Sequence, residues 1–422
     1  MLVNLLKKYI YPYIILNIIL SYFFIGVVLY LGLSIDHDIA FATPDSKTYY
    51  EVGKWLYDGT PTEYLSIRPF LFPFILYSSI SFLGIKGYFV FQFIFWLGSA
   101  NLLFATLNKL FHNTVISAIG IVLLVSNLSF VMITFHALSE VFVMFLITFF
   151  IFMLTHWIDN TRKDKAMLLM LFVLVLLTVT KPVFFYFAVL SAIIIIPILF
   201  YKYKYYKKSG KMLKLFLIFI PLFFQMGIMK VNYNTFNVST IGSETFKLYL
   251  FQRSYAIENN LNTQIAIEKV RKMSDPEVIA YILEHKISFI KTYFLNLKEN
   301  IHAYSPPYLE YKRNINTGGI IYEGNAGKYM YALNSIYYYL HIVVFFAVLF
   351  KIIRIFYKKE FNNWNICLVV LSFIFYSFLF SNAISCFEGD RLTLPTLPIW
   401  IVLYSMLVFQ SKPRKLFEIK SS

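Results

Sequence analysis

Long apolar segments alternate with short polar connections along most of the chain. A helix needs about 20 mostly apolar residues to cross the hydrocarbon core of a bilayer. The candidate spans are 12–33, 88–108, 114–135, 139–157, 166–181, 183–200, 212–230, 332–350, 363–382 and 392–409. Composition agrees, since 59% of the residues are hydrophobic and only 14% are charged. The pattern predicts an all-α polytopic membrane protein with about ten transmembrane helices.

One further apolar segment, 70–84, is long enough to be considered as a span. If it crossed the membrane, every later connection would change sides and the basic ones would face outward. The short basic connections are 108–113, 159–165, 201–211, 351–359 and the C-terminal SKPRK. With Lys7 and Lys8 inside, all of them face the cytoplasm only when 70–84 stays on the outer side, as the positive-inside rule requires. We therefore expect 70–84 to be a re-entrant or interface-lying helix. The net charge of +16 reflects this orientation and not a nucleic-acid partner.

This topology divides the chain into three parts. They are an N-terminal transmembrane module, a long outer loop, and C-terminal spans with a basic cytoplasmic tail, at 1–230, 231–331 and 332–422. The first outer loop is 34–87. In the long loop, Ser274 and Glu277 predict a capped helix start. Apolar residues then recur at helical spacing, which predicts an amphipathic helix over 275–300 that lies on the membrane surface or packs over the site.

Ionisable residues are scarce in the middle of the spans and gather at their outer ends. This distribution indicates a site at the outer face of the membrane. A proton- or ion-coupled transporter more often carries its acids near the midplane, although Asn101, Gln225 and His341 do lie within apolar segments.

The first outer loop contains PDSKTYYEVGKWLYDG, which predicts a proline-started helix with Asp45 at its entrance and Gly59 at its end. Asp45 is a candidate for chemistry, and its alternative interpretation is an N-cap that only stabilises the helix. Asp36, His37 and Asp38 are residue types that bind metals. A solvated loop explains these three better.

The remaining candidates stand where predicted spans reach the outer face. In the sequence HALSE, His136 and Glu140 are four residues apart and would share one face of a helix. A carboxylate at the edge of a span is costly unless it is used or paired. Lys181 could snorkel, and Arg391 could pair with an acid just before it. Two cations near a loop acid nevertheless suit a lipid-linked phosphate, which arginine binds with two hydrogen bonds and lysine as a point charge.

With these residues placed, the chain resembles the GT-C superfamily of polytopic glycosyltransferases, and most of all its protein-mannosyltransferase and aminoarabinose-transferase branch. Members carry an acid, a tyrosine and a glycine in the first outer loop, similar to Asp45, Tyr49 and Gly59 here. A proline-rich apolar stretch follows, similar to RPFLFPF. Glu140 in ALSE stands where members commonly have an acid.

Two later positions extend the resemblance. Arg391, with prolines after it, opens the last span as an arginine does in several members. Many members have Lys-Gly-Pro at the outer end of a middle span, whereas this chain has Lys181 directly before Pro182. The chain therefore departs from the branch at that position.

The resemblance implies an inverting transfer of a sugar from a polyprenyl-phosphate donor to a glycan, lipid or protein at the extracytoplasmic face of the plasma or inner membrane. Asp45 would orient or deprotonate the acceptor hydroxyl, and Glu140 would be a second catalytic residue. The substrate-binding residues would be Lys181, Arg391, Arg68, Tyr49 and His136. No cofactor is certain, and a divalent metal between acid and phosphate stays open.

Two other functions compete with this interpretation. An O-antigen-type polysaccharide polymerase or ligase would need an arginine-rich outer loop, whereas 231–331 holds only Arg253, Arg271 and Arg313. A lipid-linked sugar flippase or other transporter would need a polar path through the spans, which the sequence hardly supplies.

Overall fold

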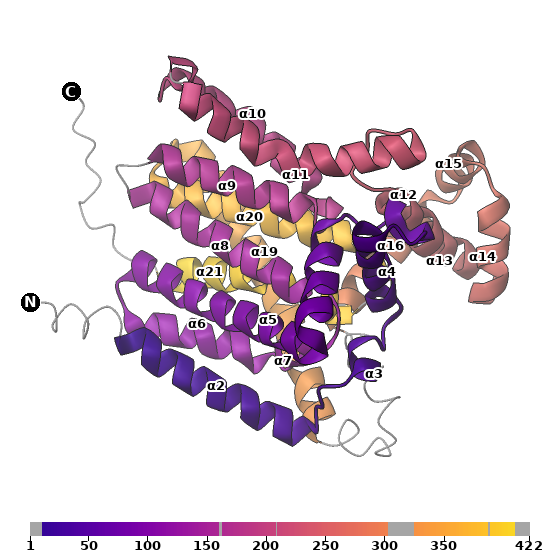
Figure 1. The fold of residues 1–422 in the computed structure, drawn as a ribbon, viewed down its shortest axis with the longest axis horizontal. Coiled ribbons are helices and arrows are strands. Elements are labelled where there is room, and N and C mark those ends of the chain that lie inside the picture. Colours follow the sequence, from indigo (N-terminus) through magenta and orange to yellow (C-terminus); the bar gives the residue numbers. More distant parts are fainter. Residues whose placement is uncertain (1–10, 160–162, 208, 303–324, 387–388, 410–422) are drawn as a thin grey trace, which may run out of the picture.

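The computed structural model describes residues 11–159, 163–207, 209–302, 325–386 and 389–409 (Figure 1). These residues contain helices and no strand, which confirms the predicted all-α fold class. The longer helices are α2 (Tyr11–Leu31), α5 (Leu71–Phe111), α6 (Thr114–Ser126), α8 (Glu140–Asp159), α9 (Lys163–Thr178), α10 (Phe185–Tyr201), α11 (Ser209–Tyr233), α19 (Asn325–Lys358), α20 (Asn363–Asn382) and α21 (Leu397–Val408). Most of them run side by side in one bundle, with α8 in contact with α5, α9, α20 and α21.

Seven helices among the described residues are long and apolar enough to cross a membrane, or eight if one bent pair counts as a single span. The protein is therefore a multi-pass membrane protein. The bent pair is Thr114–Ser126 with Ser129–Phe135, at 68° to each other. Eight of the ten expected spans correspond to these helices. The other two, 166–181 and 392–409, form shorter helices in the described residues, α9 with 16 residues and α21 with 12.

The ambiguous segment 70–84 forms a helical stretch of its own. Inside α5 the backbone leaves the helical conformation at Gly84, where φ is 68° and ψ is −179°. Only glycine adopts this combination without strain, because it has no Cβ. The break separates 71–83 from the long apolar helix after it, so the two do not form one regular helix.

The first-loop helix α4 (Pro44–Asp58) begins and ends much as the sequence predicts. Gly59 closes it in a left-handed conformation, with φ of 75°. The N-cap is Thr43, whose side chain accepts a hydrogen bond of 3.2 Å from the Ser46 amide. Asp45 is the second residue of the helix, after Pro44, so its interpretation as the N-cap is wrong. Its carboxylate is left available for other partners.

A close approach of two helices fixes the position of α4. A Cβ on Gly53 would lie 2.4 Å from the carbonyl oxygen of Pro73 and 2.5 Å from Cβ of Tyr77. Both distances are far below van der Waals contact, so only glycine allows α4 to pack this tightly on the first part of α5. The packing sets where Asp45 and Tyr49 stand relative to the bundle.

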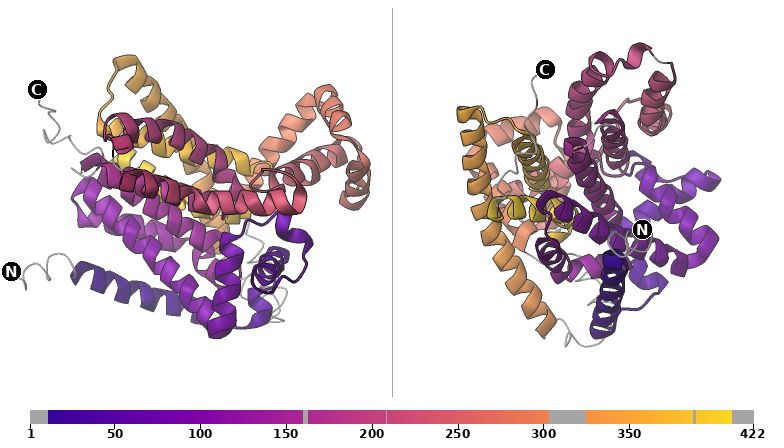
Figure 2. Two further views of the ribbon diagram at one scale, coloured as in Figure 1. Left: turned by 45° about the horizontal axis from the view of Figure 1, so that its top comes forward. Right: turned by 90° about the vertical axis from the view of Figure 1, so that its left-hand side faces the viewer.

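Shorter helices gather at the end of the bundle where α2 ends and α8 begins, which we call the site end (Figures 1 and 2). They are α12 (Ile241–Thr245), α13 (Gln252–Glu258), α14 (Thr263–Lys272), α15 (Asp275–Glu284) and α16 (Lys286–His302). The single helix expected over 275–300 is instead broken at His285. The α16 part packs on the bundle, where the Tyr293 hydroxyl donates to the Phe380 carbonyl at 2.7 Å and the Asn300 amide to that of Asn382 at 2.9 Å.

The predicted orientation can be tested by labelling single cysteines in intact cells. Ser209 begins α11 at the opposite end of the bundle from the site end, and Ser243 lies in α12; both are exposed. In a background without Cys367 and Cys386, Ser243→Cys should react with a membrane-impermeant maleimide and Ser209→Cys should not. The opposite pattern would reverse the predicted topology.

Candidate active site

Five ionisable side chains from distant parts of the sequence meet at the site end. They come from the first turn of α4, the connection before α5, the first residue of α8, the connection after α9 and the short helix η6 (Gly389–Leu392). We call them the charge cluster: Asp45, Arg68, Glu140, Lys181 and Arg391. All five are candidates that the sequence suggests, and the structure brings them together.

The charge cluster is one continuous chain of ion pairs. The two carboxylate oxygens of Asp45 pair with different arginines, Oδ1 with Arg68 and Oδ2 with Arg391. Arg391 also donates from Nε to Glu140 Oε1 at 2.9 Å, and the Lys181 ammonium reaches the same oxygen at 3.1 Å. Three cations and two carboxylates leave a formal charge of 3 − 2 = +1.

Glu140 anchors the buried half of the charge cluster. Its side chain is 0% exposed, and those of Arg391 and Lys181 are 7% and 15% exposed. Taking ions out of water is expensive, and good pairing geometry has to offset that cost. Glu140 supplies the pairing through Oε1 alone, since Oε2 has no hydrogen-bond partner among the described residues. One buried acceptor oxygen therefore remains unused beside the two cations.

Asp45 differs from Glu140 because 26% of its side chain is exposed. Burial by itself would raise the pKa of Asp45. The positive charges of Arg68 and Arg391 outweigh that effect and hold the pKa well below its usual range. The carboxylate is thus ionised and accessible, but it is a weak base while both arginines are bound to it.

Tyr49 and two residues that the sequence analysis missed position Arg68. The Arg68 guanidinium lies 4.5 Å above the centre of the Tyr49 ring, a cation–π contact. Its Nε donates to Thr48 Oγ1 at 2.8 Å, and the Tyr49 hydroxyl is 3.3 Å from Ser139 Oγ. Their positions next to candidate residues could have identified both. Thr48 lies one helical turn after Asp45, and Ser139 immediately precedes Glu140.

The expected helical face shared by His136 and Glu140 is wrong. His136 has extended backbone angles, φ −105° and ψ 147°, and α8 begins only at Glu140. The carbonyl of His136 accepts a 3.0 Å hydrogen bond from the Tyr88 hydroxyl, and the Gln92 amide donates to the Leu138 carbonyl at 3.1 Å. These buried polar groups of α5 hold the extended connection in place. His136 is therefore part of the extended connection that leads into Glu140, and its substrate-binding role stays a prediction.

The ion pairs described for Arg391 are long-range. Its partners Asp45 and Glu140 are 346 and 251 residues away in sequence. A pair with a preceding acid was the alternative, and Glu388 lies outside the described residues. The two long-range pairs tie the last helical segment of the chain to the first loop.

The side chains that the structure describes at the site do not fit a divalent metal. No group of three or more His, Cys, Asp or Glu side chains in the described residues could hold one. Both oxygens of Asp45 already pair with guanidinium groups, and the charge cluster is positive overall. His37 and Asp38 are exposed, and Asp36 caps the short helix α3 (His37–Ala40) by accepting from the Ile39 amide.

Comparison of the chain with models of protein families, with curated proteins and with solved structures finds no match in any of the three. The charge cluster itself is therefore the feature from which a function can be inferred. Its combination of excess positive charge and an accessible carboxylate limits the chemistry that it supports.

Replacing Glu140 tests whether it holds the cations in place. Glu140→Gln leaves Arg391 and Lys181 with one carboxylate fewer, and breaking a buried ion pair in this way costs about 3–5 kcal/mol. We expect a large fall in Tm, measured in lipid nanodiscs. Asp275→Asn is the control, because the Asp275 side chain is 91% exposed and lies 3.8 Å from the Lys247 ammonium, and exposed pairs contribute about 0–1 kcal/mol. Equal falls in Tm for the two variants would contradict the anchoring role.

Proposed function

We propose that the protein is a membrane glycosyltransferase that moves a sugar from a polyprenyl-phosphate donor to an acceptor hydroxyl at the extracytoplasmic face, with inversion. The observation that carries the proposal is the charge cluster, in which three cations share two carboxylates. Guanidinium and ammonium groups gathered beside an accessible carboxylate suit the phosphate of such a donor.

The cations suit the leaving group. As the bond from the anomeric carbon to the phosphate oxygen breaks, negative charge grows on the polyprenyl phosphate and needs stabilising cations more than a proton. Arg391 is 7% and Arg68 12% exposed, so both act in a partly dehydrated setting where electrostatic attraction is stronger than in water. Lys181, 15% exposed, adds a point charge.

Asp45 is the base in this proposal. The acceptor oxygen forms a bond to the anomeric carbon from the face opposite to the phosphate, the bond to the phosphate oxygen breaks, and the hydroxyl proton passes to an Asp45 oxygen. Asp45 is suited to this role because it is the more exposed of the two carboxylates. Glu140 does not meet solvent, and it acts by holding Arg391 and Lys181.

Donor binding would also make Asp45 a better base. Its pKa is lowered by Arg68 and Arg391, and a donor phosphate competes for the same two guanidinium groups. Each arginine that turns towards the phosphate lets the pKa of Asp45 rise towards its ordinary value. A base of higher pKa takes a proton more readily. Proton removal from the acceptor is then coupled to the presence of the donor.

A transfer assay with polyprenyl-phosphate sugars tests the role of Asp45. Asp45→Asn keeps the size of the side chain but cannot accept the proton, so the rate should fall about 10²–10⁴-fold. Asp58→Asn at the exposed other end of α4 is the matched control and should transfer at the wild-type rate. Wild-type transfer by a folded Asp45→Asn variant would remove Asp45 from the catalytic role.

A further inference from the structure

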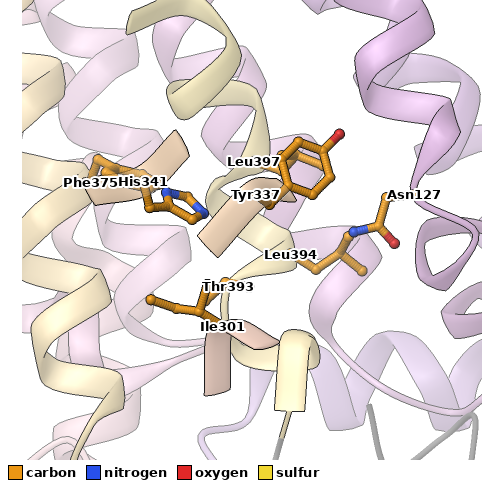
Figure 3. A pocket seen from close by; sticks show the side chains of 8 residues that line it. All are labelled: Asn127, Ile301, Tyr337, His341, Phe375, Thr393, Leu394 and Leu397. Atoms are coloured by element: carbon orange, nitrogen blue, oxygen red, sulfur yellow. The ribbon is translucent and has the colours of Figure 1, made fainter. Parts of the chain in front are cut away.

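A small cavity is lined in part by the segment that follows Arg391 of the charge cluster. It has a volume of about 20 Å³ and lies between α16, α19, α20 and that segment (Figure 3). Thr393 and Leu394 line it, and they are the second and third residues after Arg391. A cavity of about 10–15 Å³ already holds one water molecule, so this one takes a single small group.

His341 of α19 projects into the cavity and needs a partner there. The residue is 9% exposed, and its Nδ1 has no hydrogen-bond partner among the described residues. The imidazole ring packs against Phe375, with centroids 5.6 Å apart, and against Trp400 at 5.3 Å, which fixes its orientation. Buried polar atoms in proteins nearly always have a partner, so an unsatisfied one at a cavity indicates an occupant.

The opposite side of the cavity is a break between helices. Figure 3 shows the Asn127 amide across from His341. Asn127 lies outside the helical conformation, with ψ of 100°, between α6 and the short helix α7 (Ser129–Met132), and its Oδ1 accepts from the Ser129 amide at 3.0 Å. Non-helical backbone among apolar helices is tolerated where it is buried in protein or lines a cavity, and broken helices often mark binding sites.

The lining selects a neutral hydroxyl group. None of the described residues that line it is a carboxylate, lysine or arginine that would pair with a charged ligand. A ring nitrogen of neutral imidazole either donates or accepts, depending on the tautomer, whereas a hydroxyl does both and fits either form. The rings of Tyr337 and Phe375 supply apolar walls, and apolar walls with few polar groups are typical of small-molecule sites.

We propose that this cavity is a subsite for one hydroxyl group of a neutral sugar, bound through His341 Nδ1. The proposal rests on the proposed function, because a sugar next to a phosphate at Arg391 would reach the cavity past Thr393. Only the hydroxyl enters, since the volume admits no more, and the sugar ring stays outside. The hydroxyl belongs to the donor sugar or to a carbohydrate acceptor.

Saturation-transfer NMR with methyl glycosides of common hexoses and pentoses tests the subsite on the full chain in nanodiscs, without donor. His341→Phe keeps a ring but removes the hydrogen bond, so Kd should rise about tenfold. His341→Asn places an amide atom near the position of Nδ1 and should bind as the wild type does. His156→Phe, the same substitution near the end of α8 away from the cavity, should also leave Kd unchanged.

Several outcomes would overturn the subsite. If the wild-type protein shows no saturation transfer to any glycoside, the cavity holds water only. This measurement tests the subsite even if the His341→Phe variant does not fold. Equal Kd values for wild type and folded His341→Phe would also exclude it. Asp58→Asn, outside the site, should bind glycosides normally. Glycoside binding involves no proton transfer, so binding without transfer in the wild type would count against the proposed transferase and not against the subsite, whereas transfer without dependence on His341 would count against the subsite alone.

Discussion

The buried carboxylate of Glu140 is the constraint on which the site end depends. Through one oxygen it holds Arg391 at 2.9 Å and Lys181 at 3.1 Å, and without it two largely buried cations would lack their shared acceptor. It is the first residue of α8, whose apolar part is the most buried of the candidate spans. The anchor of the charge cluster therefore belongs to the most rigidly packed part of the bundle, where a shift of the carboxylate would require the core to repack.

Asp45 occupies the other end of the same ion-pair chain and has a different environment. The close contact at Gly53 presses α4 onto α5, and Arg68, stacked on Tyr49, holds one oxygen of the Asp45 carboxylate. The structure thus gives its two carboxylates unequal access to solvent. Two acids in unequal environments can have unequal roles, which in our proposal are anchoring for Glu140 and proton transfer for Asp45.

The sequence predicted the members of the charge cluster but not their connections. Glu140, Lys181 and Arg391 stand at the ends of apolar segments, Arg68 precedes one, and Asp45 begins a helix in the first outer loop. These are local signals that need no fold. The pair of Asp45 with Arg391 joins positions 346 residues apart, and no spacing rule relates them. The helical face proposed for His136 failed because hydrogen bonds from Tyr88 and Gln92 hold an extended connection there, a tertiary effect that overrides local periodicity. The helices α9 and α21 are shorter than their apolar segments predict, because hydropathy does not mark where a helix ends inside a bundle.

The central claim is that the charge cluster binds a lipid-linked phosphate, and ligand-induced stabilisation tests it most directly. A ligand that binds the folded state raises Tm, by an amount that grows with the logarithm of its concentration relative to Kd. In nanodiscs, a polyprenyl phosphate should raise Tm of the wild type, the polyprenol of equal chain length should not, and Lys181→Met should weaken the effect of the phosphate. Equal stabilisation by the phosphate and the alcohol would show that only the lipid chain is recognised and would contradict the account.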